Sequence, residues 1–133
     1  MRTIAAITVA VAVVVGGCHK KTSPENVRIE TISDAFASAG LKPSGFQPVD
    51  AQRFSAQRCL AGSIDGVDTV VCEYGSPEAL ALGKRAGEAW AGNAPTAAVL
   101  GNGRALLACA DRARVDPNGR LIHKITQAFT KAR

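Results

Sequence analysis

Cysteine is the residue type in this chain with the widest choice of chemistry. The four cysteines are Cys18, Cys59, Cys72 and Cys109. Cysteines can form disulfides, ligate metals, act as nucleophiles or carry a covalent modification. No two of them have the Cys-x-x-Cys spacing of redox motifs and zinc sites. The sequence therefore favours disulfides, isolated thiols or modification.

Other catalytic motifs are missing from the sequence. There is no Gly-x-Ser-x-Gly and no His-Glu-x-x-His, and Gly83-Lys84 lacks the upstream glycine and the following hydroxyl of a phosphate loop. Gly101-Asn102-Gly103 lacks the third glycine of a dinucleotide fingerprint. The only histidines, His19 and His123, have no carboxylate cluster beside them, and His123 falls on the polar side of a helical stripe. We therefore expect no metal, no cofactor and no enzyme activity.

The chain begins with an apolar segment that is too short to cross a membrane comfortably. After Arg2, fifteen uncharged residues run from Thr3 to Gly17. As a helix they would extend about 22 Å, less than the ~30 Å hydrocarbon core of a bilayer. A charged start, an apolar centre and a small-residue end are typical of a secretory signal peptide instead.

This segment closes on Val15-Gly16-Gly17-Cys18, which resembles the lipobox of bacterial lipoproteins. The resemblance covers residues 1–18 only. It implies a signal peptide of residues 1–17, cleavage between Gly17 and Cys18, and a diacylglyceryl thioether on Cys18, often with an acylated amine. Two or more acyl chains, such as palmitate, hold a protein stably on a membrane.

The same resemblance predicts a location in the cell envelope. His19, rather than Asp, follows the cysteine, and the sorting rule of enteric lipoproteins then directs a protein to the outer membrane, facing the periplasm. The inner membrane and the cell surface remain open. Residues 18–26 are polar and without periodicity, so we expect a lipidated tether there.

The remaining residues, 27–133, have the length of a single domain. Cleavage would leave residues 18–133, in which fifteen Lys and Arg face eleven Asp and Glu, a mildly basic balance. Five basic residues in the last third form either a solvated face or a surface for anionic lipid or an acidic partner. They are Arg104, Arg112, Arg114, Arg120 and Lys124. Nucleic-acid binding would need denser basic clusters with aromatic residues, so we expect no nucleic-acid partner.

The most specific prediction for the domain is a β-hairpin. Residues 58–64 and 67–74 flank Asp65-Gly66, a pair suited to a two-residue type I′ turn. Counting outward from this turn puts Cys59 opposite Cys72, at a pair without mutual hydrogen bonds, where side chains lie closest. In an oxidising compartment we expect a disulfide between them, with two reduced buried thiols as the alternative.

Helical spacing and turn residues predict the other elements. A first helix starts near Val27 and ends before Gly40, and Pro48 limits residues 45–50 to an edge strand or an extended loop. The remaining expected elements are a helix from Pro77 to about Ala91 capped by Ser76, a hairpin of residues 96–100 and 104–110 around Gly101-Asn102-Gly103, and a helix through residues 121–129 after Asp116-Pro117-Asn118-Gly119. Gly83 and Gly87 inside the second helix suggest close approach to a neighbouring backbone.

Residues 57–91 and 95–131 look like one strand-strand-helix unit used twice. The predicted fold is α+β, in the order α-(β)-β-β-α-β-β-α. It is a two-layer sandwich with a mainly antiparallel sheet of about four strands and helices packed on it. With helices on one face, apolar residues of the other face would be exposed for a partner, unless the first helix covers them.

We expect a membrane-anchored envelope lipoprotein that acts as a non-catalytic binding or structural module. Its partners would be the membrane, through the lipid, and an envelope protein whose identity the sequence does not give. Two alternatives stay open: a thiol-dependent redox enzyme using Cys109, and a carrier of a lipid or small hydrophobe between the sheet and the first helix. Cys109, between Ala108 and Ala110, is expected to be a buried, inert thiol. The oligomeric state stays open as well.

Overall fold

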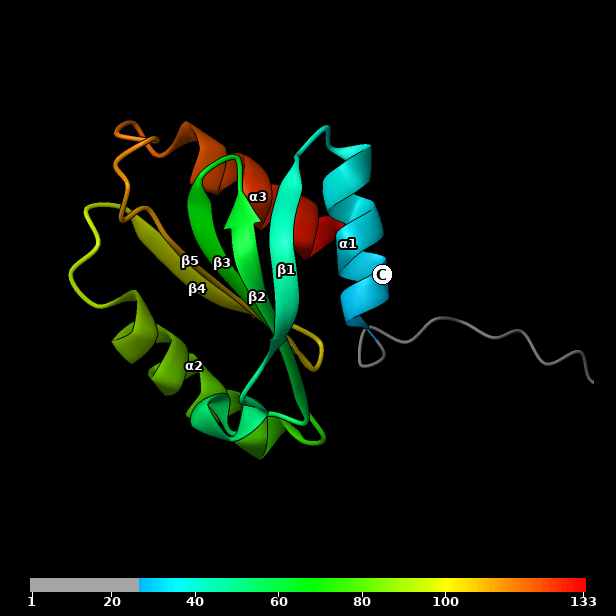
Figure 1. The fold of residues 1–133 in the computed structure, drawn as a ribbon. Helices are drawn as coiled ribbons and strands as arrows, with labels where there is room; N and C mark the ends of the chain where they lie inside the picture. Colours follow the sequence, from blue (N-terminus) through cyan, green and yellow to red (C-terminus); the bar gives the residue numbers. More distant parts are fainter. Residues whose placement is uncertain (1–26) are drawn as a thin grey trace, which may run out of the picture.

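The computed structural model describes residues 27–133, which form an antiparallel sheet with helices on both of its faces (Figure 1). The signal peptide predicted for residues 1–17, its cleavage site between Gly17 and Cys18, and the tether expected at residues 18–26, which includes His19, lie outside the described residues. The helices are α1 (Ile29–Ser38), α2 (Pro77–Ala91) and α3 (Arg120–Lys131), with a short 3-10 helix η2 (Ala51–Phe54). The strands are β1 (Pro43–Val49), β2 (Arg58–Ile64), β3 (Val67–Glu73), β4 (Ala97–Asn102) and β5 (Ala105–Ala110).

The five strands lie in the order β1-β2-β3-β5-β4, and all neighbours are antiparallel. The predicted α+β class and element order are confirmed, but the sheet has five strands rather than four. The extra strand is β1, which contains Pro48 and pairs only with β2 at the sheet edge. An edge strand tolerates a proline because one side of its backbone needs no sheet partner.

The first hairpin has the predicted register. Asp65 and Gly66 both have positive φ, at 47° and 91°, as a type I′ turn requires. Ile64 then pairs with Val67, and Cys59 pairs with Cys72. Local turn chemistry was sufficient here, because a two-residue turn leaves no freedom in the pairing of the strands that it joins.

The second hairpin differs from its prediction. Its turn is Gly103-Arg104, since β4 continues through Gly101 and Asn102 to the closing pair Asn102–Ala105. The Asn102 side chain donates hydrogen bonds to the carbonyl oxygens of Phe129 and Ala132, at 2.8 and 2.9 Å. Asn102 therefore caps the end of α3 instead of forming the turn, and this long-range role leaves no local signal.

The two hairpins lead into helices on opposite faces of the sheet. α2 packs on β4 and β5 from one side, whereas α1 and α3 pack together on the other side. The prediction of helices on one face with a two-layer sandwich is corrected: the domain has three layers. Residues 57–91 and 95–131 repeat the order of elements but not their placement.

Local capping explains where the helices begin. The Ser76 hydroxyl accepts a hydrogen bond from the Ala79 N–H, and Pro77 is the first residue of α2, as predicted. α3 begins differently, because its cap is the buried carboxylate of Asp116, which accepts from the N–H groups of Leu121 and Ile122 at 3.0 and 2.9 Å. Pro117 therefore belongs to the preceding turn rather than to the helix.

Gly83 and Gly87 of α2 leave room for the side chains of Tyr74 and Val99 rather than for a neighbouring backbone. A Cβ at Gly83 would overlap the phenol of Tyr74, and one at Gly87 would lie 3.0 Å from Val99 Cγ1. The Tyr74 hydroxyl, which lies against Gly83, donates to the Phe54 carbonyl oxygen at 2.9 Å. The expectation of backbone approach is corrected in this respect.

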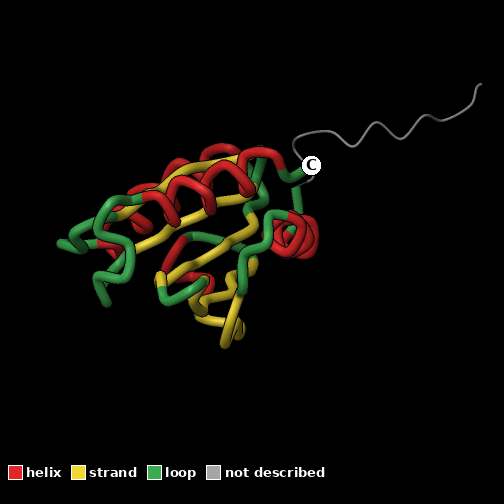
Figure 2. The backbone as a smooth tube through the Cα atoms, turned by 90° about the horizontal axis from the view of Figure 1, so that it is seen from above, coloured by secondary structure: helices red, strands yellow, loops and turns green. Residues whose placement is uncertain are grey.

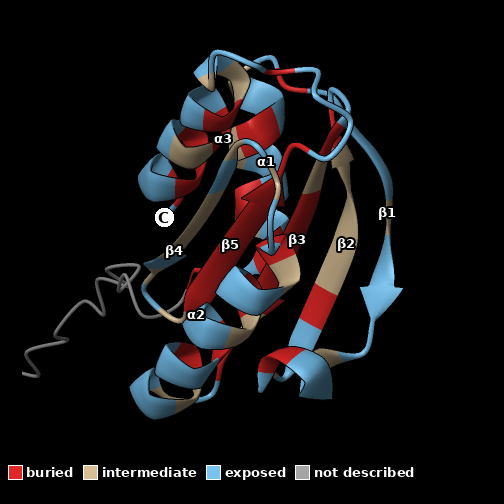
Figure 3. Ribbon diagram, turned by 90° about the vertical axis from the view of Figure 1, so that its left-hand side faces the viewer, coloured by how far each residue is buried: buried red, intermediate tan, exposed pale blue. Residues whose placement is uncertain are grey.

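Burial differs most between the interior strand β5 and the edge strand β1. Every residue of β5 is buried, whereas six of the seven residues of β1 are exposed (Figure 3). Among residues 27–133, no helix combines the length and the apolar character needed to cross a bilayer.

Candidate functional site

The structure separates the described cysteines onto the two faces of the sheet. Cys59 and Cys72 form a disulfide beneath α2, with Cα atoms 4.1 Å apart. Cys109 lies in β5 within the core beneath α1 and α3, which also contains Ile64 and Val67. Because alternate residues of a strand point to opposite faces, the thiol and the disulfide have the sheet between them.

Cys109 is a buried thiol in an apolar environment. Its exposed fraction is 0 %, and burial raises the pKa of Cys109 to about 12. Its sulfur accepts a hydrogen bond from the Thr69 hydroxyl at 3.9 Å, a long and weak contact that lowers the pKa slightly. At neutral pH this thiol stays protonated and shielded from solvent, as the sequence predicts for an inert cysteine.

The five predicted partner-binding residues do not form one surface. Arg104 lies in the turn before β5, whereas Arg112 and Arg114 follow β5 at its opposite end. Arg120 and Lys124 lie on α3. The sequence places these residues within 21 positions of each other, but the strand and the helix between them carry them to separate parts of the domain.

Two of these arginines already have intramolecular partners. Arg104 donates to the Gly75 carbonyl oxygen at 3.0 Å. Arg112 pairs with Asp68 at 2.9 Å, donates to the Trp90 carbonyl oxygen, and stacks over the Trp90 ring at 4.4 Å from its centroid. These contacts fix the loop after β5 to β3 and to the end of α2, so Arg112 has a structural role here.

A further ion pair fixes α1 to the sheet. Arg58 of β2 donates to the Glu30 carboxylate at 2.6 Å, and this hydrogen bond lowers the pKa of Glu30 and raises that of Arg58. The Glu73 carboxylate accepts from the Ile29 N–H at 2.8 Å, at the start of α1. The pair with Glu30 is exposed and contributes little to stability.

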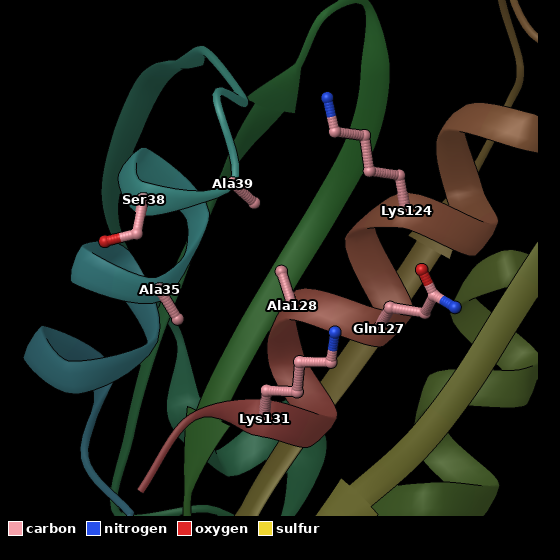
Figure 4. Close-up of a pocket in the computed structure, with 7 residues that line it drawn as sticks. All are labelled: Ala35, Ser38, Ala39, Lys124, Gln127, Ala128 and Lys131. Carbon is pink, nitrogen blue, oxygen red and sulfur yellow. The ribbon is translucent and has the colours of Figure 1, made fainter.

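A groove of about 520 Å³ lies between α1 and α3 (Figure 4). Its lining is Ala35, Ser38, Ala39, Lys124, Gln127, Ala128 and Lys131. Ala35 and Ala39 point from α1 toward α3, and the two lysines extend from α3 (Figure 4). The groove therefore combines a narrow apolar floor with positive charge along one wall.

Two residues of this groove, Gln127 and Lys131, were not among the candidates predicted from the sequence. Lys131 and Gln127 continue the row of Arg120 and Lys124 at positions i, i+4, i+7 and i+11, which is one face of a helix. This spacing could have identified the row of basic residues from the sequence. The row was not recognised because the candidates were grouped with Arg104, Arg112 and Arg114, which belong to other parts of the fold.

A small apolar pocket lies between α1, β1 and the sheet. It is lined by Ile29, Ser33, Phe36, Pro43, Phe46 and Val71, and its volume is about 90 Å³. Pockets that hold drug-sized ligands have volumes of about 300–1,000 Å³. The space between the sheet and the first helix is therefore too small for a lipid chain in this conformation.

Other ligand chemistry has little support within residues 27–133. In this part of the chain no three His, Cys, Asp or Glu side chains are grouped so that they could hold a metal ion. His123 is exposed on α3, as predicted. The buried carboxylate of Asp111 accepts from the N–H groups of Val115 and Asp116 at 3.0 and 2.8 Å, so it organises the loop before α3.

Comparison with known proteins gives no relative for this chain: no protein-family description, curated protein or solved structure matches it.

Proposed function

We propose that the protein is an envelope lipoprotein, anchored by lipid on Cys18, that acts as a non-catalytic binding or structural module. The observation that carries this proposal is the sequence Val15-Gly16-Gly17-Cys18 after a short apolar segment. Cleavage before Cys18 would leave a nine-residue polar tether, residues 18–26, between the lipid and the domain. The outer membrane, facing the periplasm, is the proposed location.

The Cys59–Cys72 disulfide supports export of the domain. It also leaves Cys18 without a disulfide partner in the domain, so that Cys18 can carry a lipid. Cys59 and Cys72 are bonded to each other, and Cys109 is enclosed by the core beneath α1 and α3. A structural disulfide also fits an oxidising compartment such as the periplasm. Cys18 is thus free for modification without competing for a disulfide partner within the domain.

The placement of Cys109 argues against a redox enzyme. Thiol–disulfide exchange needs a thiolate that can reach a disulfide sulfur in line. Here the thiol has a pKa raised to about 12, and the disulfide lies on the other face of the sheet. The carrier alternative is disfavoured by the pocket of about 90 Å³ beneath α1.

Processing of a Cys18→Ser variant tests the anchor. We expect this variant to accumulate as a precursor that retains residues 1–17, because the lipid acceptor is missing. Its domain should still fold and form the Cys59–Cys72 disulfide. Cys109→Ala is the matched control, since it removes a cysteine from the same chain and should be processed normally. Normal processing and membrane attachment of Cys18→Ser would overturn the proposal.

Thiol titration separates the structural module from the redox enzyme. In the native, membrane-extracted protein we expect no thiol that reacts quickly with an alkylating reagent at pH 8. After denaturation without reductant, one thiol should react, and it should be Cys109. Fast alkylation of Cys109 in the native protein would favour the redox alternative.

In situ crosslinking in intact envelopes tests the binding role. We expect to recover a reproducible protein partner. Substitutions on the surface of the domain that leave its core intact should abolish this crosslink. Failure to recover any such partner over repeated experiments would count against a binding module and leave a purely structural one.

A further inference from the structure

We propose that the exposed row of basic residues on α3 docks the domain onto the anionic phospholipid surface of the membrane to which Cys18 is anchored. We call this row the α3 stripe, and it consists of the basic residues Arg120, Lys124 and Lys131 together with the uncharged Gln127 on the same face. The inference rests on the proposed lipid anchor and adds an orientation and a lipid specificity to it.

The α3 stripe has the charge that an anionic surface would attract. All four of its residues are exposed, and α3 contains no acidic residue. None of its three basic side chains forms an ion pair within residues 27–133, in contrast to Arg58 and Arg112. Positive charge on the stripe is therefore not neutralised by the fold.

The wall opposite the stripe carries no opposing charge. On the α1 side, the groove is lined by Ala35, Ser38 and the C-cap residue Ala39. Of the acidic residues of α1, Glu30 is paired with Arg58 on the sheet side, and Asp34 is not part of the groove lining. The groove thus presents lysine ammonium groups beside an uncharged floor, which suits the phosphate groups of lipids.

The tether ends close to the stripe. Val27 and Arg104 line the same pocket at the β4–β5 turn, and Asn102 of that hairpin caps the C-terminal end of α3. The start of α1 and the end of α3 therefore lie at the same end of the domain. Figures 1 and 2 both place the C-terminus, marked C, on the side of the domain where α1 lies. Lys131, at this end, is the stripe residue nearest in sequence to the cap.

The tether is also short enough to keep the stripe near the bilayer. Nine residues span at most about 30 Å when fully extended, and α3, with 12 residues, is about 18 Å long. Attraction to an anionic surface decays over a Debye length of about 8–10 Å at physiological salt. A tethered domain therefore visits the range in which each basic residue strengthens surface binding about fivefold.

A label on the stripe can report docking in the lipidated full-length protein. Gln127→Cys provides one exposed thiol for a spin label, because Cys18 would be lipidated, Cys59 and Cys72 are bonded, and Cys109 is buried. Leu82→Cys provides the matched control, since Leu82 is 55 % exposed on α2, across the sheet. The readout is the collision rate of each label with a neutral, water-soluble nickel complex.

We expect label 127 to collide several-fold less often on vesicles with 30 % phosphatidylglycerol than on pure phosphatidylcholine vesicles. Label 82 should be equally accessible on both. Salt at 1 M, with a Debye length near 3 Å, should abolish the difference. Combined Arg120→Gln, Lys124→Gln and Lys131→Gln should abolish it too, whereas Lys124→Arg with Lys131→Arg should preserve it.

Each other outcome overturns a defined part of the account. Equal accessibility of label 127 on both vesicles, with the protein still floating with them, rejects docking but keeps the anchor. Failure to float with either vesicle rejects the anchor itself. Protection of label 82 instead of label 127 would place the docking surface on α2 and reject the α3 stripe. Protection of label 127 in native envelopes but not on anionic vesicles means that the stripe binds a protein rather than lipid.

Discussion

The two faces of the sheet are stabilised in different ways. The core beneath α1 and α3 contains 16 buried residues of the described chain, and that beneath α2 and η2 contains eight. The smaller core holds the disulfide and the hydrogen bond from Tyr74 to Phe54. The larger core holds Cys109 as a plain apolar side chain. Where less apolar surface is available, a covalent bond and a buried hydrogen bond supplement it.

This difference also separates structural residues from candidates for function. Beneath α2, the register of the first hairpin and the contact of Tyr74 with Gly83 serve packing. Outside the larger core, α3 presents a basic row that packing does not use. Both cores therefore stabilise the fold, whereas the outer surface of α3 is left for the proposed docking.

The largest expected effect is on the core beneath α1 and α3. Phe129 of α3 is completely buried. Phe129→Ala should lower the free energy of unfolding by about 3–5 kcal/mol, because it removes a large buried side chain and leaves a cavity. The counterpart in the smaller core, Leu80→Ala, should cost about 2 kcal/mol, since Leu80 is 9 % exposed. Urea unfolding measures both, and a larger loss for Leu80→Ala would contradict the comparison.

Loss of the disulfide should affect stability by a slightly smaller amount. The double variant Cys59→Ala with Cys72→Ala reopens a loop between residues 13 positions apart. Its free energy of unfolding should fall by about 2–3 kcal/mol, as the denatured chain gains conformational freedom. Cys109→Ala is the control for removing a cysteine from the other face. Unfolding with and without reductant should show a reductant effect in the wild type and in Cys109→Ala only.

Gly83→Ala should destabilise the domain, although alanine has a higher helix propensity than glycine. Alanine favours a helix over glycine by about 1 kcal/mol. At Gly83, however, the added Cβ would overlap the Tyr74 phenol, which is fixed by its hydrogen bond to Phe54. We expect Gly83→Ala to lower the melting temperature, at a cost of about 1–2 kcal/mol. Gly87→Ala, where Val99 can shift slightly, should be close to neutral, and equal effects at both positions would reject this explanation.

Alkaline pH should destabilise the domain in two steps. The first comes from Cys109 beneath α1 and α3, and the second comes from Tyr74 beneath α2. A thiol in the unfolded chain ionises near pH 8.5, whereas Cys109 in the fold has a pKa of about 12. The fold binds the proton more tightly, so its stability is full below pH 8.5 and falls as pH rises toward 12, by about 1 kcal/mol between pH 8.5 and 9.5. Tyr74, also raised to about 12, contributes only above pH 10.

Melting temperatures across pH 7 to 11 check this prediction. Cys109→Ala should flatten the decline that begins near pH 8.5, and Tyr74→Phe should flatten only the part above pH 10. The slopes are compared rather than the absolute stabilities, because both variants also change packing. An unchanged slope in Cys109→Ala would mean that the thiol is not protected from ionisation.

Local chemistry explains which parts of the fold the sequence predicts. Asp65-Gly66 determines its hairpin register, and the pair Cys59–Cys72 follows from that register alone. Ser76 and Pro77 likewise determine the start of α2. In each case the deciding residues are neighbours in the sequence.

Long-range contacts explain what the sequence does not predict. β5 inserts between β3 and β4, so α2 must cross one face of the sheet, and α3 then takes the other. Asn102 belongs to β4 because it caps α3, which begins 18 residues later. The basic candidates were chosen from their proximity in sequence, and only the helical spacing within α3 proved to bring charges together.

Mass spectrometry of the N-terminal peptide of the protein extracted from membranes determines whether Cys18 is lipidated. We expect a peptide that begins at Cys18 and carries a diacylglyceryl group. A peptide that begins at Met1, or one that begins near Cys18 with an unmodified thiol, would contradict this expectation.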